Sequence, residues 1–204
     1  MSHRFLIATI CATLLLAAHV PTATALDLNP LTALKSVVEA AVEDRTADDI
    51  ASDLAIKGKL TANVIDKMGS DVISIGADVY EQVVMLTGTV ETGKQKTQAG
   101  RLAKDVENVK NVYNEILVIK AIDKEKGSVE NYVDDSVIET KINAQLLDAG
   151  GVSVTNYRYR SVGGRVFLLG RALSNAELKK ALGIVKGIDG VKSVKSRIFV
   201  RAKK

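Results

Sequence analysis

Histidine, cysteine and tryptophan are almost absent from this sequence. Tryptophan does not occur, and the two histidines and the single cysteine all lie near the N-terminus, as His3, His19 and Cys11. The rest of the chain therefore lacks the imidazole and thiolate groups that Ser-His-Asp and Cys-His catalysis require. It also lacks the usual ligands of zinc and most transition metals. The composition disfavours an enzyme, and we expect no catalytic residues, no metal site and no cofactor.

The N-terminus has the pattern of a secretory signal. Arg4 precedes an apolar run from Phe5 to Val20 that is shorter than a typical transmembrane helix. Ala23-Thr24-Ala25 provides small residues at positions −3 and −1 relative to the expected cleavage site. We expect cleavage after Ala25 and export to the periplasm, with an uncleaved membrane anchor as the alternative. Cys11 lies inside the apolar run rather than at a cleavage point, which argues against lipidation.

Carboxylate pairs are the remaining candidates for catalysis. Asp48-Asp49 and Asp134-Asp135 each precede an apolar pattern typical of a helix. Acidic residues in the first turn interact favourably with the helix dipole, which explains both pairs without invoking a reaction. A small hydrolase that uses carboxylates alone remains a remote alternative.

The sequence contains an internal repeat. In the later part of each unit, glycine and apolar positions recur 82 residues apart, for example Gly88 and Gly170, Ala99 and Ala181, Val106 and Ile188, and Ile116 and Ile198. The first helices align at an offset nearer 88. That difference predicts that the segment after the first helix differs in length between the units.

Each unit has the pattern helix, strand, strand, helix, strand. Ile138, Ile142 and Leu146 are spaced for one helical face, Gly163-Gly164 fits a tight hairpin turn, and Ser174 with Glu177 fits a capping box. The sequence therefore predicts an α+β fold of two tandem αββαβ modules, each a small three-stranded mixed sheet with two helices on one face. The expected segments are a signal peptide over 1–25, an N-terminal helical segment over 26–43, the first module over 44–120, a linker over 121–130 and the second module over 131–204.

Three short signatures occur in both units. The first is an acidic helix start, in Asp48-Asp49-Ile50 and in Asp134 to Ile138. The second is a strand that ends in glycine, in Leu86-Thr87-Gly88 and in Leu168-Leu169-Gly170. The third is the pattern Gly-Val-x-x-Val at the last strand, present as Gly190 to Val194 in the second unit and, with Asn108 in place of the glycine, as Asn108 to Val112 in the first. Together they resemble the BON domain of bacterial osmotically induced periplasmic and outer-membrane-associated proteins, over about residues 46–119 and 132–200. The resemblance implies a non-enzymatic periplasmic protein that supports the cell envelope under osmotic stress and binds phospholipid surfaces.

Charge is distributed unevenly between the units. Residues 44–120 hold 10 basic and 12 acidic side chains, whereas residues 129–204 hold 14 basic and 7 acidic ones. Because basic surfaces attract anionic lipid in a salt-dependent way, we expect the second module to bind anionic phospholipid membranes peripherally. The candidate lipid-binding residues are Lys141, Gln145, Leu147, Arg158, Arg160, Lys179 and Lys180. A solvated basic face that only keeps the protein soluble, and a core position for Leu147, are the corresponding alternatives.

Envelope proteins and nucleic acid are the alternatives to lipid as partners. A protein-interaction or chaperone-like module could contact envelope proteins through edge strands or apolar helix faces. Nucleic acid is disfavoured by the secretory signal and by the lack of aromatic residues interleaved with the basic ones.

Overall fold

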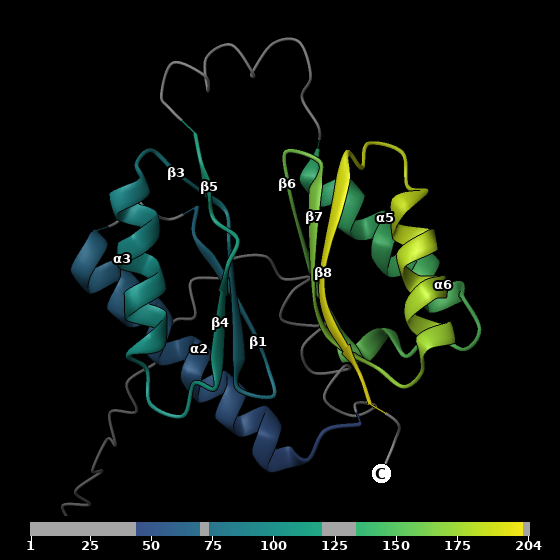
Figure 1. The fold of residues 1–204 in the computed structure, drawn as a ribbon, viewed down its shortest axis with the longest axis horizontal. Helices are drawn as coiled ribbons and strands as arrows, with labels where there is room; N and C mark the ends of the chain where they lie inside the picture. Colours follow the sequence, from purple (N-terminus) through teal and green to yellow (C-terminus); the bar gives the residue numbers. More distant parts are fainter. Residues whose placement is uncertain (1–43, 70–73, 120–133, 202–204) are drawn as a thin grey trace, which may run out of the picture.

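The computed structural model describes residues 44–69, 74–119 and 134–201. The expected signal peptide, N-terminal helical segment and linker lie outside these ranges. Two modules are built alike, their sheets face each other, and the helices cover the outer side of each sheet (Figure 1). The prediction of an α+β fold made of two repeated modules is confirmed.

The first module contains two helices and short strands. Its elements are α2 (Ala47–Met68), β1 (Gly76–Tyr80), β2 (Val83–Thr87), β3 (Thr89–Val90), α3 (Gly93–Lys104), β4 (Asn111–Asn114) and β5 (Leu117–Val118). Strand β2 is central, antiparallel to β1 and parallel to β4, while β3 and β5 form a separate parallel pair. Helix α3 is the crossover that a parallel pair requires.

The second module has the same topology with longer strands. Its elements are α5 (Asp135–Asp148), a 3₁₀ turn η2 (Val154–Asn156), β6 (Tyr157–Val162), β7 (Arg165–Ala172), α6 (Asn175–Lys186) and β8 (Ser193–Val200). The order is β6-β7-β8, with β7 antiparallel to β6 and parallel to β8.

The repeat offset is 82 throughout, so the prediction of a different offset for the first helices is wrong. The buried face of α5, formed by Ile138, Ile142 and Leu146, matches that of α2, formed by Ile56, Leu60 and Val64, at this offset. Helix α2 simply begins earlier than its counterpart. The buried apolar positions determine which residues of the two helices are equivalent, because they must pack against the sheet. The residue at which the helix begins can differ between the modules.

Gly88 and Gly170 occupy equivalent positions and solve the same steric problem. Their φ angles are 103° and 136°, in the region that favours glycine. A Cβ atom on Gly88 would lie 1.7 Å from the Ser74 carbonyl oxygen, and one on Gly170 would lie 2.0 Å from that of Asn156. Each module therefore requires this glycine because a neighbouring chain segment passes close to it. Gly88 follows the end of β2 as predicted, whereas Gly170 lies inside β7 rather than at its end.

Side chains cap the helices as the sequence indicates, with one difference. Asp134 and Ser174 are the N-caps of α5 and α6, and Thr92 forms a full capping box with Gln95 at α3. The capping box predicted for Ser174 is only half present. The Glu177 carboxylate instead accepts hydrogen bonds from Leu173 N–H, Ser153 N–H and the Tyr157 hydroxyl. These donors are buried or partly buried, so losing their acceptor would cost more than it would at the exposed N-cap.

Each module has its own apolar core between helices and sheet. Tyr157 and Tyr159 belong to the core of the second module, as their alternation with Arg158 and Arg160 predicts. A third cluster lies between the two sheets and is formed by Tyr80, Met85, Phe167 and Leu169. The modules therefore share a buried seam.

Candidate functional site

Five of the seven candidate lipid-binding residues lie on the outer helical layer of the second module. Lys141, Gln145 and Leu147 belong to α5, and Lys179 and Lys180 belong to α6. Leu147 is 62% exposed, so the core alternative for this residue is wrong. Gln145 and Lys179 are also exposed, whereas Lys141 is half-buried and lies 3.8 Å from Asp189.

The C-terminal end of α5 is tied to α6 by one of these lysines. Lys180 Nζ donates a 2.6 Å hydrogen bond to the carbonyl oxygen of Gly150. This contact places the loop that follows Leu147 beside the exposed side of α6.

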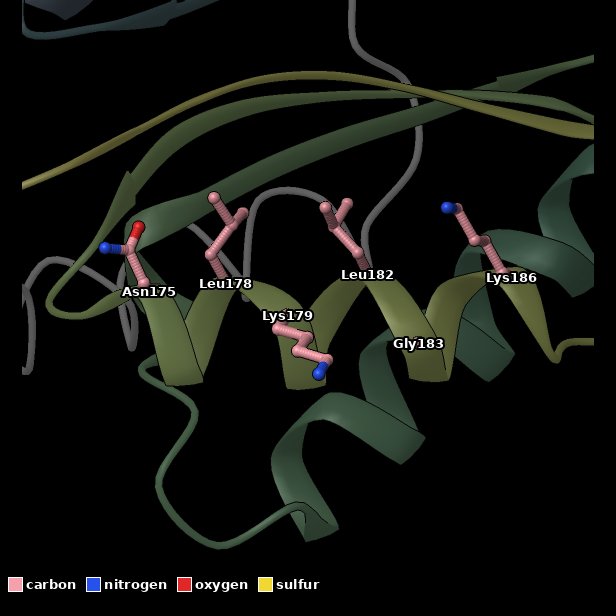
Figure 2. A pocket seen from close by; sticks show the side chains of 6 residues that line it. All are labelled: Asn175, Leu178, Lys179, Leu182, Gly183 and Lys186. Carbon is pink, nitrogen blue, oxygen red and sulfur yellow. The ribbon is translucent and has the colours of Figure 1, made fainter.

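An open groove of about 450 Å³ runs along α6. Its lining combines Leu178 and Leu182 with the cations Lys179 and Lys186, and includes Asn175 and Gly183 (Figure 2). The two leucines are only partly buried, and both lysines are exposed. An apolar stripe flanked by lysines whose ammonium groups reach water is typical of a helix that can lie on a membrane surface.

The other two candidate residues face the first module rather than the outside. Arg160 Nε and one terminal guanidinium nitrogen donate to the two carboxylate oxygens of Asp78, at 2.9 and 3.2 Å. The guanidinium carbon of Arg158 lies 5.6 Å from the centre of the Tyr80 ring. In this arrangement both arginines contribute to the contact between the modules.

Asp78 is buried, and its ionised form is held by positive charge. Burial by itself would raise the pKa of this carboxyl, but the guanidinium of Arg160 and the ammonium of Lys57 outweigh it, and the pKa lies below its ordinary value. The bidentate geometry of the Arg160 contact adds directional hydrogen bonds to this attraction.

Glu115 forms a second charged contact between the modules. Its Oε1 accepts hydrogen bonds of 2.9 and 2.7 Å from Arg197, and its Oε2 lies 2.6 Å from Lys195 Nζ. The pKa of Glu115 lies below its ordinary value. Burial alone would raise it, but the hydrogen bonds from Lys195 and Arg197 lower it by more. The guanidinium of Arg197 also stacks 4.6 Å from the ring centre of Tyr113.

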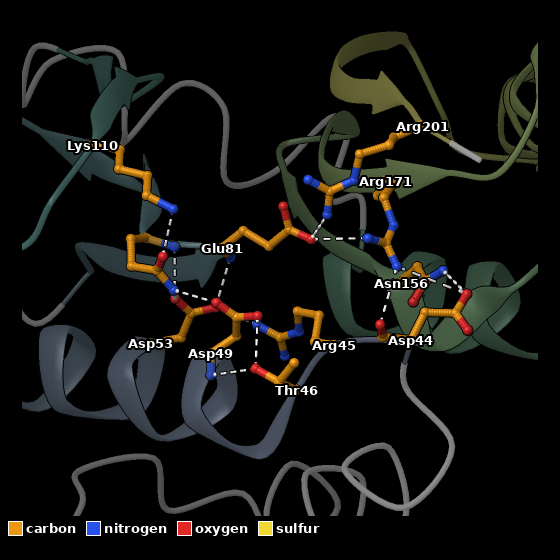
Figure 3. Close-up of polar contacts among 11 residues, drawn as sticks. Asp44, Arg45, Thr46, Asp49, Asp53, Glu81, Lys110, Asn156, Arg171 and Arg201 are labelled. Atoms are coloured by element: carbon orange, nitrogen blue, oxygen red, sulfur yellow. Dashed lines mark hydrogen bonds and ion pairs between the residues drawn. The ribbon is translucent and has the colours of Figure 1, made fainter. Parts of the chain in front are cut away.

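Glu81 is the centre of a third charged contact, shown in Figure 3. Its carboxylate accepts from Arg171 at 3.1 Å and also pairs with Arg201. Arg171 additionally donates to the Asp44 carbonyl oxygen at 3.4 Å, and Asn156 donates to the Asp44 carboxylate at 3.2 Å. The acidic groups therefore come from the first module and the basic groups from the second.

This interface explains much of the charge asymmetry seen in the sequence. Acidic Asp78, Glu81 and Glu115 of the first module meet basic residues of the second, namely Arg160, Arg171, Lys195, Arg197 and Arg201. Sequence reasoning missed this pairing. The available signal was opposite charge at positions 82 apart, Asp78 with Arg160 and Glu115 with Arg197.

The aspartate pairs considered for catalysis lie at helix starts. The side-chain hydrogen bond from Ser136 lowers the pKa of Asp134, and that from Thr46 lowers the pKa of Asp49. Both groups thus serve the helix ends that they occupy. Within residues 44–69, 74–119 and 134–201, no cluster of three or more His, Cys, Asp or Glu side chains is arranged to hold a metal ion.

Within the described part of the chain, no helix combines the length with the hydropathy needed to cross a bilayer.

Comparison with known proteins identifies the repeated module. The BON domain family model matches twice, over residues 52–120 and 134–202, which again are 82 apart. The chain is 34% identical over 144 residues to osmotically-inducible protein Y of Escherichia coli K12, covering 71% of this chain and 70% of that protein.

Two further relatives match over shorter spans. The chain is 34% identical over 120 residues to the outer membrane lipoprotein DolP of Haemophilus influenzae, covering 59% of each chain. It is 39% identical over 130 residues to an uncharacterized protein in the gshII 5′ region of Anaplasma centrale, covering 64% of this chain and 82% of that one.

Proposed function

The chain belongs to the BON domain family, and on that premise we propose that it is a non-enzymatic periplasmic protein of the bacterial envelope that binds anionic phospholipid surfaces. Binding occurs mainly through the second module, in a peripheral and reversible way. The names of two relatives, an osmotically-inducible protein and an outer membrane lipoprotein, support a role at the envelope under osmotic stress.

The observation that carries this proposal is the groove along α6, whose lining combines apolar and basic side chains. Leu178 and Leu182 provide apolar surface in the groove, and Lys179 and Lys186 flank it with positive charge. Leu147 adds a large exposed aliphatic side chain from the neighbouring helix. Each basic residue close to an anionic membrane contributes about 1 kcal/mol of attraction, and buried apolar area adds to it.

Two of the seven candidate lipid-binding residues lie at the contact with the first module. Arg158 and Arg160 already contact Tyr80 and Asp78 of the first module, and would have to leave those partners to bind lipid. We therefore assign lipid contact to the outer residues Lys141, Gln145, Leu147, Lys179 and Lys180, together with Lys186.

Vesicle co-sedimentation tests the proposal. The chain from residue 26 onward is mixed with neutral vesicles and with vesicles containing phosphatidylglycerol or cardiolipin, at low and high salt. Binding to anionic vesicles alone, weakened by salt, is expected. Lys179→Glu combined with Lys186→Glu should reduce that binding at least tenfold, because it replaces two attractive charges by two repulsive ones.

The repeat supplies a matched control. Lys104 of α3 is the counterpart of Lys186, and Lys94 lies on the same helix. Lys94→Glu combined with Lys104→Glu makes the same change in net charge on the first module and should leave binding within about twofold. Equal losses in both double variants would contradict the assignment to the second module, and no sedimentation with any vesicle would contradict lipid binding altogether.

The alternative function is an interaction with envelope proteins. It is favoured by exposed apolar side chains on the helices of both modules, among them Leu54, Ile65 and Val137. Such contacts would persist at high salt, whereas binding to lipid headgroups would not. This function would be supported if the protein does not sediment with vesicles but suppresses the aggregation of an unfolded substrate protein at high salt.

A further inference from the structure

The two modules touch each other at equivalent positions of the repeat. Asp78 pairs with Arg160 and Glu115 pairs with Arg197, and the members of each pair are 82 residues apart. The strand registers confirm the equivalence, since Asp78 faces Met85 across β1 and β2 just as Arg160 faces Phe167 across β6 and β7. Contacts between equivalent residues are what a two-fold axis produces, so the interface has the geometry of an isologous dimer within one chain.

That geometry dictates what would happen if two identical modules met through this face. Two first modules would place Asp78 against Asp78 and Glu115 against Glu115. Two second modules would place Arg160 against Arg160 and Arg197 against Arg197. Like charges next to a buried seam repel strongly. Two copies of the same module therefore do not associate through this face, whereas a first module and a second module do.

The apolar residues at the seam are buried only because the two modules cover each other. Tyr80 and Met85 of the first module are fully buried, and Phe167 and Leu169 of the second are 4% and 0% exposed. If the modules separated, each sheet would present an apolar centre, flanked by acidic side chains on the first module and by basic ones on the second. Apolar patches of this kind are seldom left in contact with water.

We propose that each sheet face is a binding site for the complementary module of a second copy of this chain, so that two chains form a reciprocal dimer by exchanging modules. The exchanged dimer contains the same two interfaces as two closed monomers. Within one chain the tethered module has a high effective concentration, so the closed monomer dominates in dilute solution and the dimer accumulates as protein concentration rises.

Two charge-reversed full-length variants test the proposal. The first carries Asp78→Arg with Glu115→Arg, so that both of its faces are basic at these positions. The second carries Arg160→Asp with Arg197→Glu, so that both of its faces are acidic at these positions. Neither can close on itself without like-charge contacts. Mixed together, the two variants regain opposite charges at both interfaces and should form a 1:1 dimer.

Size-exclusion chromatography with light scattering gives the readout. Each variant alone is expected near the monomer mass of 21.8 kDa, and the mixture near twice that value. Circular dichroism checks that both variants keep their helices and sheets. A chain carrying all four substitutions is the control, because it restores opposite charges within one molecule and should remain monomeric with either variant. A mixture of folded variants that stays monomeric overturns the proposal.

Wild-type protein provides a second measurement if either variant fails to fold. Chains from residue 26 onward, which lack Cys11, are labelled separately with a donor and an acceptor dye through Ala176→Cys on the exposed start of α6. The two preparations are mixed at about 1 mM and at about 1 µM. Energy transfer that develops at the high concentration and disappears slowly on dilution is expected for exchanged dimers. Absence of transfer at both concentrations overturns the proposal.

Discussion

Asp53 and Asp135 occupy equivalent positions of the two modules, and each holds the hairpin turn of its own module. Asp53 accepts hydrogen bonds of 2.7 Å from both Glu81 N–H and Gln82 N–H. Asp135 accepts from Gly163 N–H at 2.7 Å and Gly164 N–H at 2.9 Å. One carboxylate per module thus fastens the first helix to the turn between the first two strands.

Removing either carboxylate should destabilise the protein. Asp53→Ala leaves two turn N–H groups without their acceptor, and we expect a loss of about 2–3 kcal/mol in the free energy of unfolding. Asp135→Ala should cost less, because its turn consists of glycines, whereas Glu81 and Gln82 are held at φ angles of 50° and 63° without that freedom. Urea unfolding followed by circular dichroism measures both variants.

Asp148→Ala is the matched control for these two variants. This residue lies at the exposed end of α5, outside both turns. A change below about 0.5 kcal/mol is expected for it. If Asp135→Ala were equally harmless, the turn contacts would carry no stability.

The geometry shared by Gly88 and Gly170 gives a second prediction. Gly88→Ala and Gly170→Ala each put a methyl group against a carbonyl oxygen, at a φ angle that alanine avoids. We expect each to lower the free energy of unfolding by about 3 kcal/mol or more. Gly183→Ala is the control, because nothing lies within 4 Å of a Cβ at this helical position, and it should raise stability by up to about 1 kcal/mol. Thermal unfolding ranks the three variants, and a stable Gly88→Ala would refute the steric argument.

Acid should weaken the contact between the modules. The pKa values of Asp78 and Glu115 are lowered from their ordinary 3.8 and 4.5 in the folded chain. Each group therefore binds fewer protons folded than unfolded, and its contribution is present above pH about 4.5 and is lost as pH falls through the lowered folded values. Urea unfolding at a series of pH values from 7 to 2.5 should show a steep loss of stability below pH about 4.

The variant Asp78→Asn with Glu115→Gln tests the origin of that loss. It should be less stable than wild type at pH 7 by about 3 kcal/mol, because Arg160 and Arg197 lose their charged partners. Its stability should depend less on pH below 4.5, so that the two curves approach each other in acid. Parallel curves would assign the acid sensitivity to other carboxyl groups.

Much of the fold could be read from the sequence because it depends on local and periodic signals. The spacing of Ile138, Ile142 and Leu146 and the turn glycines Gly163 and Gly164 predicted α5 and its hairpin correctly. The offset of 88 expected for the first helices sets Ile50 opposite Ile138, and it is wrong because Ile56 is the residue of α2 that is buried at that position. The true counterpart of Asp135 is Asp53, whose partner Glu81 lies 28 residues away and could not be recognised from spacing alone.

The surface was harder to predict than the core. Lys179 and Lys180 are on the outer face as a binding role requires, whereas Arg158 and Arg160 contact the other module. Period-two alternation indicated correctly that these arginines leave the core of their own module. It could not say what covers the opposite side of the sheet, because that depends on how two modules pack.

Shared burial between the sheets should make the two modules unfold together. Phe167 is 4% exposed and packs in the same cluster as Tyr80 and Met85 of the first module. Calorimetry of the wild type should therefore show one cooperative transition.

Phe167→Ala removes about 3–5 kcal/mol of packing at the seam. Because it leaves the core of each module intact, it should split the transition in two. Ala181→Gly, within the core of the second module, should lower the transition temperature while keeping a single transition. Two separate transitions in the wild type would show that the seam does not couple the modules, and that the charges at its rim act on neighbours that fold independently.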